Sequence, residues 1–316
     1  AMNKIIDNKN LWNDFSVNGI KNVRKYYTWK AHVEAYLEEA EKLIKQTQDN
    51  TEAFAPVGRK LLVAEKLIVT DIDNTLVGEE DALKEFIELL NSTDSKVGFA
   101  VATGRNIDSA VEILKEYNIP FPDIFISSVG SEIYYNYRNE LIPSTGWKAH
   151  IRYQWNRDKV KKILSKLDFL KYQDEENQRE FKLSYFMDDD ENLLEEVKNT
   201  LIKNKIKANV IFSNGEFLDI LPYRASKGKA IRYLAYRWNL PYENILVAGD
   251  SGNDSEMLKG DLLGVVVANY SPELEELKGQ SRVYFAKRKF AGGIIEGINH
   301  YDFLKKKSEV EVEQED

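Results

Sequence analysis

The sequence predicts an α/β protein whose parallel sheet is interrupted by an inserted α+β domain, and two observations predict it. Apolar runs of strand length alternate with helical stretches in two separate parts of the chain, which is typical of a parallel sheet with crossover helices. Between these parts, residues 145–222 contain helices and a strong hairpin signal instead. We therefore expect an α/β core that carries residues 145–222 as an insertion.

The elements of the core follow from this alternation. In the first part we expect strand 67–72, helix 80–90, strand 97–102, helix 107–117 and strand 123–128. In the second part we expect helix 228–239, strands 245–249 and 263–267, and a further strand in "RVYFA" near residue 284. Parallel pairing would place the carboxyl ends of all these strands along one edge of the sheet.

The insertion has a different pattern. We expect helix 156–167, a strand in "FKLSYFM" and helix 190–204. The stretch "ANVIFSNGEFLDILP" then predicts two strands joined at Asn214-Gly215, because Asn-Gly is a strong signal for a tight hairpin turn.

Composition narrows the class of protein. The 316 residues exceed the usual length of one domain and include no cysteine, so a disulfide framework and thiolate sites are excluded and a reducing cytoplasm is the expected location. The formal net charge of -8 disfavours nucleic acid as a partner, and an anionic substrate would need a local positive site. Without an apolar run near the ~20 residues of a membrane helix, we expect no membrane association.

Charged and polar residues gather where the predicted strands end and the following helices begin. These residues are Asp71, Asp73, Thr103, Gly104, Lys227, Asp250 and Asp254. Each residue alone is weak evidence for a functional site, because a short acidic loop is usually a solvated turn and a lysine before a helix is usually a surface residue. Together they favour a functional site, since ligands of open parallel sheets bind at the carboxyl ends of the strands.

Four short motifs carry a resemblance to a known superfamily. In this order, "DIDNTLVG", "TGR", "SKG" and "GDSGND" resemble the motifs of the haloacid dehalogenase superfamily, whose members are mostly magnesium-dependent phosphatases with an aspartate nucleophile. The resemblance implies a haloacid dehalogenase-like Rossmannoid sheet, and the insertion is similar to a C2-type cap. Leu76 stands where an aromatic residue is common in the first motif, and no catalytic position is missing.

Longer strings narrow the resemblance to one family. "SSVGSEIYY", "HIRYQWNRDKV", "NQREFKLSYFMD", "LPYRASKGKAIRYL" and "FAGGIIEGINHYDFL" resemble the sucrose-phosphate phosphatases, including the phosphatase domains fused to sucrose-phosphate synthases. This resemblance covers about residues 61–305. It implies core segments 61–144 and 223–305, a cap at 145–222, and Mg²⁺-dependent hydrolysis of sucrose 6-phosphate to sucrose and phosphate.

The resemblance also implies a role for each site residue. Asp71 would be the nucleophile and form an aspartyl-phosphate, while Asp73 would act as general acid and base. The metal ligands would be Asp71, Asp250, the carbonyl of Asp73, and Asp254 directly or through a water. The phosphoryl oxygens would be held by Lys227, Thr103 and the amide of Gly104, with Asn253 orienting the loop or the phosphate.

In the cap, "NQREFKLSY" alternates as a strand and carries four polar residues. Gln178, Arg179, Lys182 and Ser184 are either an ordinary solvated face or a set of groups that hydrogen-bond sugar hydroxyls. The resemblance favours the second interpretation. A sugar phosphate is therefore the expected substrate, and another one, such as a mannosylfructose phosphate, is the alternative.

The N-terminal sixty residues are a separate question. Residues 30–48 have the pattern of an amphipathic helix, residues 49–58 that of a linker, and residues 306–316 form an acidic tail. The stretch 11–37 resembles the closing segment of the glycosyltransferase domain of sucrose-phosphate synthases. We therefore expect that residues 1–60 connect the phosphatase to a synthase domain in a longer bifunctional chain, and that this chain has no glucosyltransferase activity. A catalytically silent regulatory domain is disfavoured, because Asp71 and Asp73 are both present.

Overall fold

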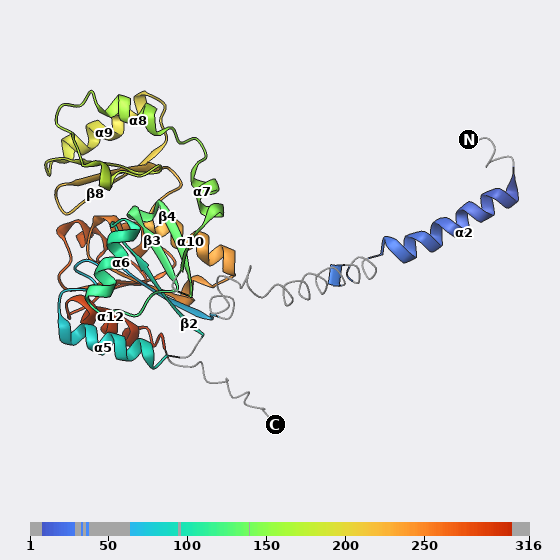
Figure 1. Ribbon diagram of the computed structural model, residues 1–316, viewed down its shortest axis with the longest axis horizontal. Coiled ribbons are helices and arrows are strands. Elements are labelled where there is room, and N and C mark those ends of the chain that lie inside the picture. The colour runs from blue at the N-terminus through green and yellow to red at the C-terminus, as the bar shows by residue number, and fades with distance from the viewer. Residues whose placement is uncertain are drawn as a thin grey trace. The chain divides into compact units, whose positions relative to one another are not determined.

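A computed structural model describes residues 8–28, 33, 36–37, 64–93, 96–138 and 140–304 of the chain. The chain divides into two compact units, Ala1–Pro56 and Val57–Asp316, and each is described by itself (Figure 1). The predicted linker at 49–58, most of the predicted helix at 30–48 and the acidic tail at 306–316 lie outside the described residues.

In the first unit, helix α2 spans Lys9–Tyr26, which begins well before the predicted helix at 30–48. Its start is fixed by Asn8, whose side chain accepts hydrogen bonds from the backbone amides of Asn10 and Leu11. Large apolar side chains lie along it more than half exposed, among them Trp12, Phe15, Ile20 and Val23.

The second unit is built on an eight-stranded sheet with the order β12-β11-β10-β1-β2-β3-β4-β5. The strands are β1 (Lys66–Thr70), β2 (Val97–Ala102), β3 (Ile124–Ser127), β4 (Glu132–Tyr137), β5 (Glu140–Pro143), β10 (Ile245–Gly249), β11 (Leu263–Val266) and β12 (Val283–Phe285). Neighbours from β12 to β3 are parallel, as predicted, and their bounds agree with the predicted strands within two residues. The sequence did not predict β4 and β5, which extend one edge as antiparallel strands.

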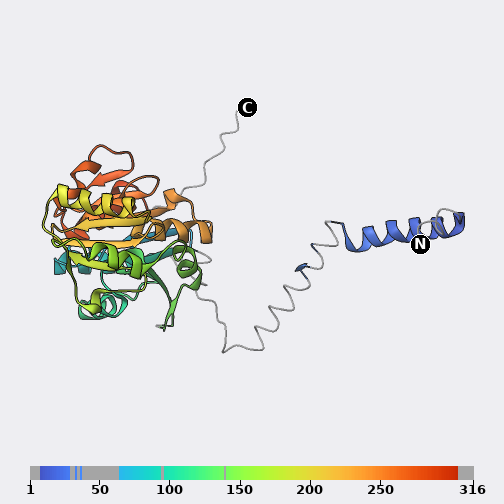
Figure 2. The same cartoon turned by 90° about the horizontal axis from the view of Figure 1, so that it is seen from above.

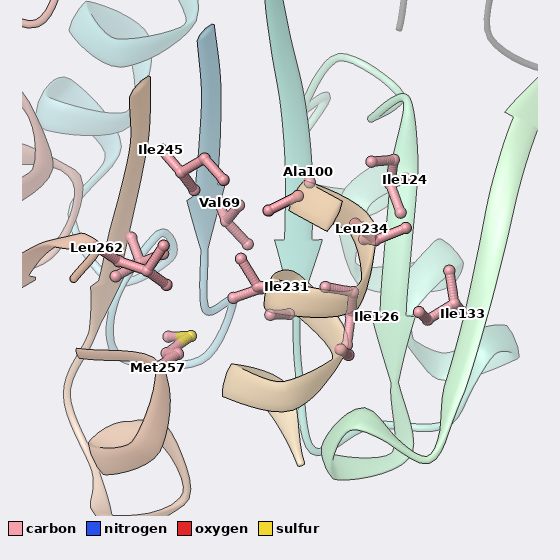
Figure 3. Close-up of a cluster of buried hydrophobic side chains, with 14 of the residues drawn as sticks. Val69, Ala100, Ile124, Ile126, Ile133, Ile231, Leu234, Ile245, Met257 and Leu262 are labelled. Atoms are coloured by element: carbon pink, nitrogen blue, oxygen red, sulfur yellow. The ribbon is translucent and has the colours of Figure 1, made fainter. Parts of the chain in front are cut away.

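Helices cover both faces of this sheet. They are α5 (Glu80–Asn91), α6 (Ile107–Glu116), α7 (Thr145–Ile151), α10 (Lys227–Trp238), α11 (Ser255–Leu258) and α12 (Phe290–His300). On one face, Ile231 and Leu234 of α10 pack against Val69, Ile124 and Ile126 of the sheet (Figure 3).

The other face is covered by α5 and α12, whose Phe86 and Ile294 pack in one cluster with Ile68 of β1. Val69, the next residue of β1, belongs to the first face. Burial on both faces explains why this strand is a continuous apolar run rather than an alternating one. Within the described ranges, no helix is long and apolar enough to cross a membrane.

Above the carboxyl ends of the central strands lies a second, four-stranded antiparallel sheet with the order β6-β7-β9-β8. We call this sheet and its helices the cap; its elements are α8 (Arg157–Leu164), β6 (Lys171–Tyr172), β7 (Leu183–Phe186), α9 (Glu191–Lys203), β8 (Ala208–Ser213) and β9 (Phe217–Pro222). The predicted turn at Asn214-Gly215 joins β8 to β9, with positive φ at both residues. The helices α8 and α9 lie on the side of the cap sheet away from the central sheet (Figures 1 and 2).

The two faces of the cap sheet differ in chemistry. Leu183, Tyr185, Leu218 and Ile220 pack against the two cap helices. Side chains alternate along a strand, so the residues between them project toward the central sheet. On this second face the polar pair Ser184 and Asp219 lies in register across β7 and β9, next to the apolar pair Phe186 and Phe217.

Candidate active site

The predicted carboxylates meet because β1 and β10 are parallel neighbours in the sheet. Asp71 directly follows β1 and Asp250 directly follows β10. The backbone amide of Asp71 donates a hydrogen bond to Ala248 O of β10 at 2.9 Å. Together with Asp254 they form a buried group in which one oxygen of each carboxylate lies within 4.8 Å of the others. The strand ends thus bring three predicted site residues to one point.

Lys227 reaches the same point from the first turn of α10. Its side chain is fully buried, and Nζ lies 2.7 Å from Asp71 Oδ1 and 2.6 Å from Asp254 Oδ1. Ser226 caps the helix through its side chain. Gly130, in the short turn after β3, lies against the start of α10. Only glycine fits there, because its φ is +88° and a Cβ would be 2.1 Å from the Ser226 backbone.

Asp254 shapes the loop between β10 and α11 as well as binding Lys227. Its Oδ2 accepts hydrogen bonds from the amides of Asp250 at 3.0 Å and Ser251 at 3.1 Å. Asp250 itself accepts a hydrogen bond from Thr75 Oγ1 at 2.9 Å. Thr75 lies in the first motif, but its role was not predicted, because only the fold shows that it faces a loop 175 residues later.

The electrostatics of the cluster follow from burial and close like charges. Burial raises the pKa of Asp71 well above its usual value, and the ammonium of Lys227 opposes this effect. Burial, followed by the charge of Asp254, raises the pKa of Asp250 to about 7. Burial alone would lower the pKa of Lys227, but its two carboxylate partners outweigh burial, so this pKa is raised.

These residues fit a divalent cation with hard oxygen ligands. Three buried carboxylates face one ammonium, which leaves an excess of negative charge in a site shielded from water. A divalent cation bound by carboxylate oxygens would offset that charge. Because both oxygens of Asp254 already have partners, Asp71 and Asp250 are the members with the most freedom to bind a metal.

Asp73 lies apart from this cluster of acceptors. Its carboxylate is paired with Arg105, whose Nη2 and Nε lie 2.7 Å and 2.8 Å from Oδ1 and Oδ2, and it is 44% exposed. Arg105 also donates to Ser109 Oγ at 2.8 Å. The guanidinium therefore holds the side chain of the predicted acid–base residue in place. Arg105 belongs to "TGR", but its pairing with Asp73 was not predicted.

The predicted phosphate-binding residues surround the same edge. Thr103 directly follows β2, is fully buried, and its Oγ1 accepts a hydrogen bond from the amide of Arg105 at 3.1 Å. Gly104 follows it, and a Cβ at this position would lie 3.8 Å from Asn253 Nδ2. The Oδ1 of Asn253 is buried without a hydrogen-bond partner among the described residues. Thr103, Gly104 and Asn253 therefore line one side of the site together.

The four predicted cap residues have different surroundings. Ser184 Oγ donates to Asp219 Oδ1 at 2.5 Å, and Lys182 Nζ lies 3.4 Å from the same oxygen. Gln178 instead holds cap backbone, since its Nε2 donates to Gln173 O at 3.0 Å and to Ser184 O at 2.9 Å. Lys182 and Ser184 thus form one buried polar group with Asp219, which the sequence did not single out.

Arg179 lies where the cap meets the core, and its Nη1 donates to the cap backbone at Glu176 O and Gln178 O. Its Nε lies 4.0 Å from Glu132 Oε1, and Glu132 Oε2 accepts hydrogen bonds from Ser127 and Ser128 at 3.1 Å and 3.0 Å.

Elsewhere, a cleft of about 730 Å³ lies between the cap and the core. It is lined by residues 209–212 of β8 and by Gly252 and Asn253, among others. The cap therefore stands directly over the loop that carries the carboxylates.

Comparisons with known proteins show which family the chain resembles. The family model of sucrose-6F-phosphate phosphohydrolase matches residues 64–302. The chain is 35% identical over 254 residues to probable sucrose-phosphatase 2 of Arabidopsis thaliana, which covers 74% of this chain and 59% of the relative. It is 32% identical over 241 residues to the mannosylfructose-phosphate phosphatase of Agrobacterium fabrum, covering 75% of this chain and 96% of that protein.

Solved structures give the same result. The sucrose-phosphatase of Synechocystis sp. PCC6803, solved with sucrose and phosphate, matches with a TM-score of 0.73 and 35% identity over 77% of this chain and 100% of that one. A haloacid dehalogenase-like hydrolase of Bacillus subtilis shares the fold, with a TM-score of 0.55 at 18% identity. The chain spans about three-fifths of the length of the plant relatives that it matches. It belongs to the sucrose-6F-phosphate phosphohydrolase family, with the haloacid dehalogenase fold.

Proposed function

We propose that this protein is a Mg²⁺-dependent phosphatase that hydrolyses sucrose 6-phosphate to sucrose and phosphate. The observation that carries the proposal is the buried cluster of Asp71, Asp250, Asp254 and Lys227, in a chain of this family. The cap above it carries a buried polar group of Lys182, Ser184 and Asp219. We propose residues 61–144 and 223–305 as the catalytic core and 145–222 as the insertion that carries the cap. The first helix of this insertion, α7, packs on the core through Trp147 and Ile151. The absence of cysteine supports a reducing, cytoplasmic location.

In the first half of the proposed reaction, an Asp71 carboxylate oxygen bonds to phosphorus and the bond from phosphorus to the sugar oxygen breaks. Asp73 gives its proton to the departing oxygen, so that sucrose leaves as an alcohol. In the second half, Asp73 takes a proton from water, whose oxygen bonds to phosphorus. The aspartyl-phosphate bond then breaks, and inorganic phosphate leaves with Asp71 restored.

The surrounding residues prepare these steps. Lys227 holds Asp71 through a 2.7 Å contact and offsets negative charge as the phosphoryl group approaches. Asp73 must exchange its pairing with Arg105 for the bridging oxygen of the substrate before it can act as an acid. When bound at Asp71 and Asp250, Mg²⁺ would neutralise and orient the phosphoryl oxygens. Thr103, Gly104 and Asn253 line the place where these oxygens would lie.

A panel of sugar phosphates tests this proposal. We expect Mg²⁺-dependent release of phosphate, with the highest kcat/KM for sucrose 6-phosphate, and no release after removal of the metal by a chelator. Monosaccharide phosphates should react more slowly, because they cannot fill both sugar positions beneath the cap. Activity that survives exhaustive chelation would contradict the metal requirement.

Mannosylfructose phosphate is the second candidate substrate, and one observation favours it. The Agrobacterium fabrum phosphatase that bears this substrate in its name is covered over 96% of its length, whereas the plant sucrose-phosphatases are covered over 59%. The two disaccharide phosphates differ in one sugar ring, so the cap must distinguish them. A higher kcat/KM for mannosylfructose phosphate than for sucrose 6-phosphate would select this alternative.

We further propose that α2 packs on a glycosyltransferase domain of the same polypeptide. Its exposed Trp12, Phe15, Ile20 and Val23 form an apolar face that is costly to leave in water. The resemblance of residues 11–37 to the end of such a domain in sucrose-phosphate synthases supports this partner. In that arrangement the phosphatase would act on the product of the neighbouring domain.

A further inference from the structure

One carboxylate joins the cap to the loop that carries Asp250 and Asp254. Glu273 lies in the short helix η5 (Pro272–Leu277), after β11. Its Oε2 accepts hydrogen bonds from the amide of Gly252 at 2.8 Å and from Ser271 Oγ at 2.7 Å. Its Oε1 accepts a longer one, at 3.4 Å, from the amide of Gly215.

These partners belong to two different parts of the fold. Gly252 lies between Asp250 and Asp254, and Gly215 lies at the tip of the hairpin between β8 and β9 of the cap. The amide of Ser271 also bonds to Asp250 O at 2.7 Å. Glu273 therefore holds the carboxylate loop from its outer side while its second oxygen reaches the cap hairpin.

The packing around Gly252 shows how closely the two parts approach. A Cβ at this position would lie 2.5 Å from Phe212 O of β8 and 2.9 Å from Glu273 Oε2. A residue with a side chain would thus push the cap strand or the carboxylate away. The glycine allows the backbone of the carboxylate loop to touch the backbone of the cap.

We propose that Glu273 is a positioning residue that couples the place of the cap hairpin to the geometry of the metal-binding loop. When the hairpin rests on Glu273, this carboxylate fixes Gly252 and Ser271, and through them Asp250. When the hairpin lifts, the loop loses one of its fixed contacts. Cap docking and metal affinity then strengthen each other, because coupling between two sites is reciprocal.

This inference rests on the proposed metal-dependent function, and its test uses Mg²⁺ alone. The variants are Glu273→Ala, Glu273→Gln, which keeps the size of the side chain but only one oxygen acceptor, and Glu275→Gln as a control. Glu275 lies on the same short helix, is exposed, and contacts Lys278 and Tyr270 instead of the loop. Circular dichroism and thermal unfolding first confirm that each variant is folded.

Two readouts are then compared. Calorimetric titration should show the Kd for Mg²⁺ rising ~10-fold or more in Glu273→Ala, the scale of one lost hydrogen bond to a charged group. It should rise less in Glu273→Gln and stay unchanged in Glu275→Gln. Hydrogen exchange should show that Mg²⁺ slows the amides of residues 213–216 in wild-type protein and in the control, but not in Glu273→Ala.

An unchanged Kd in Glu273→Ala, or hairpin protection by Mg²⁺ that survives this substitution, would overturn the inference. Neither readout uses a sugar phosphate, so a wrong substrate would leave both intact. If wild-type protein bound no Mg²⁺, the proposed cofactor would be wrong. The exchange rates of residues 213–216 in metal-free wild type and Glu273→Ala would then decide whether Glu273 joins the hairpin to the loop, and equal rates would overturn it.

Discussion

Lys227 is completely buried yet remains charged, because Asp71 and Asp254 lie on either side of its ammonium group. Burying any one of these charges alone would be strongly unfavourable, and their close contact offsets that cost. The arrangement also explains why the strand-end carboxylates are not a solvated turn. Asp71 and Asp254 are instead buried in contact with Lys227 of α10.

The proposed roles of Asp71 and Asp73 give the first prediction. In the proposed reaction, Asp71→Asn removes the attacking oxygen anion and Asp73→Asn removes the proton donor, so each should lower kcat by ~100-fold or more. The measurement is phosphate release at saturating Mg²⁺, with Asp81→Asn, a highly exposed residue of α5, as the matched control. Near-normal turnover in either active-site variant would show that its role is assigned wrongly.

The raised pKa of Asp250 gives a second prediction, on stability. Its pKa is about 7 in the folded protein against 3.8 for an ordinary aspartate, so the folded state binds this proton more tightly than the unfolded chain. The stability from that proton is fully present below about pH 4 and is lost as the pH rises through about 7. Asp250→Asn cannot ionise, so without metal at about pH 8 its Tm should exceed that of wild type by ~2–4 °C or more.

Thermal unfolding in the presence of a chelator measures the Tm difference between Asp250→Asn and wild type. This Tm difference should shrink toward about pH 5, where Asp250 is protonated. Mg²⁺ at about pH 8 should raise the Tm of wild type but not of the variant. A gap between the two proteins that does not change with pH would contradict the explanation by burial.

The sequence indicated most of these residues, but not those whose role depends on a distant partner. Asp71, Asp250 and Lys227 were predictable because they flank strands and helices in a recognisable order. Thr75 and Glu273 were not, because a threonine and an exposed-looking glutamate have no motif of their own. Their partners lie 175 and 21 residues away in the sequence, and only the tertiary fold brings them into contact.

Secondary structure was predictable where burial alone determines the pattern. Strands β1, β2 and β10 are buried on both faces, which gives unmistakable apolar runs. Strands β4 and β5 lie at the sheet edge, mostly half-exposed, and their mixed sequence gives no clear period. Helix α12 contains three glycines that disfavour helix, yet a Cβ at Gly297 would lie 2.3 Å from Val265 Cγ2. Close packing on β11 therefore overrides the propensity.

The buried polar group of Lys182, Ser184 and Asp219 in the cap gives a third prediction. If Lys182 binds sugar hydroxyls, as the resemblance implies, Lys182→Ala should raise KM for the disaccharide phosphate ~10-fold or more, because one hydrogen bond to a charged group is lost. KM for p-nitrophenyl phosphate should stay unchanged, since that substrate has no sugar. Lys166→Ala, at an exposed position after α8, is the control. Equal changes for both substrates would mean that Lys182 only supports the cap through Asp219.

The chain divides into two units that differ in structure. The unit Val57–Asp316 contains both sheets and the entire carboxylate cluster. The unit Ala1–Pro56 contains α2 with its exposed apolar side chains. The resemblance indicated this division from the sequence, but the position of α2 at Lys9–Tyr26 was not predicted, since its apolar residues share one face with glycine and serine.

Deleting residues 1–56 gives the fourth prediction. The shortened chain should keep the kcat/KM and the unfolding temperature of the catalytic unit, because every residue of the proposed site lies beyond residue 70. It should also be less prone to associate, since the exposed face of α2 is gone. Titration of the full chain with UDP-glucose should show no binding. Collapse of the shortened protein, or saturable UDP-glucose binding, would overturn this division of roles.

The central claim is that the reaction passes through an aspartyl-phosphate on Asp71. Its most direct test is to measure the mass of the protein during a single turnover. Protein with Mg²⁺ is mixed with sucrose 6-phosphate, quenched in acid within one turnover, and analysed by mass spectrometry of the intact chain and its peptides. We expect a transient species that is heavier by one phosphoryl group, carried on Asp71, formed only with Mg²⁺ and absent from Asp71→Asn. Release of sucrose and phosphate with no phosphorylated protein at any time, or a phosphoryl group on another residue, would contradict the account.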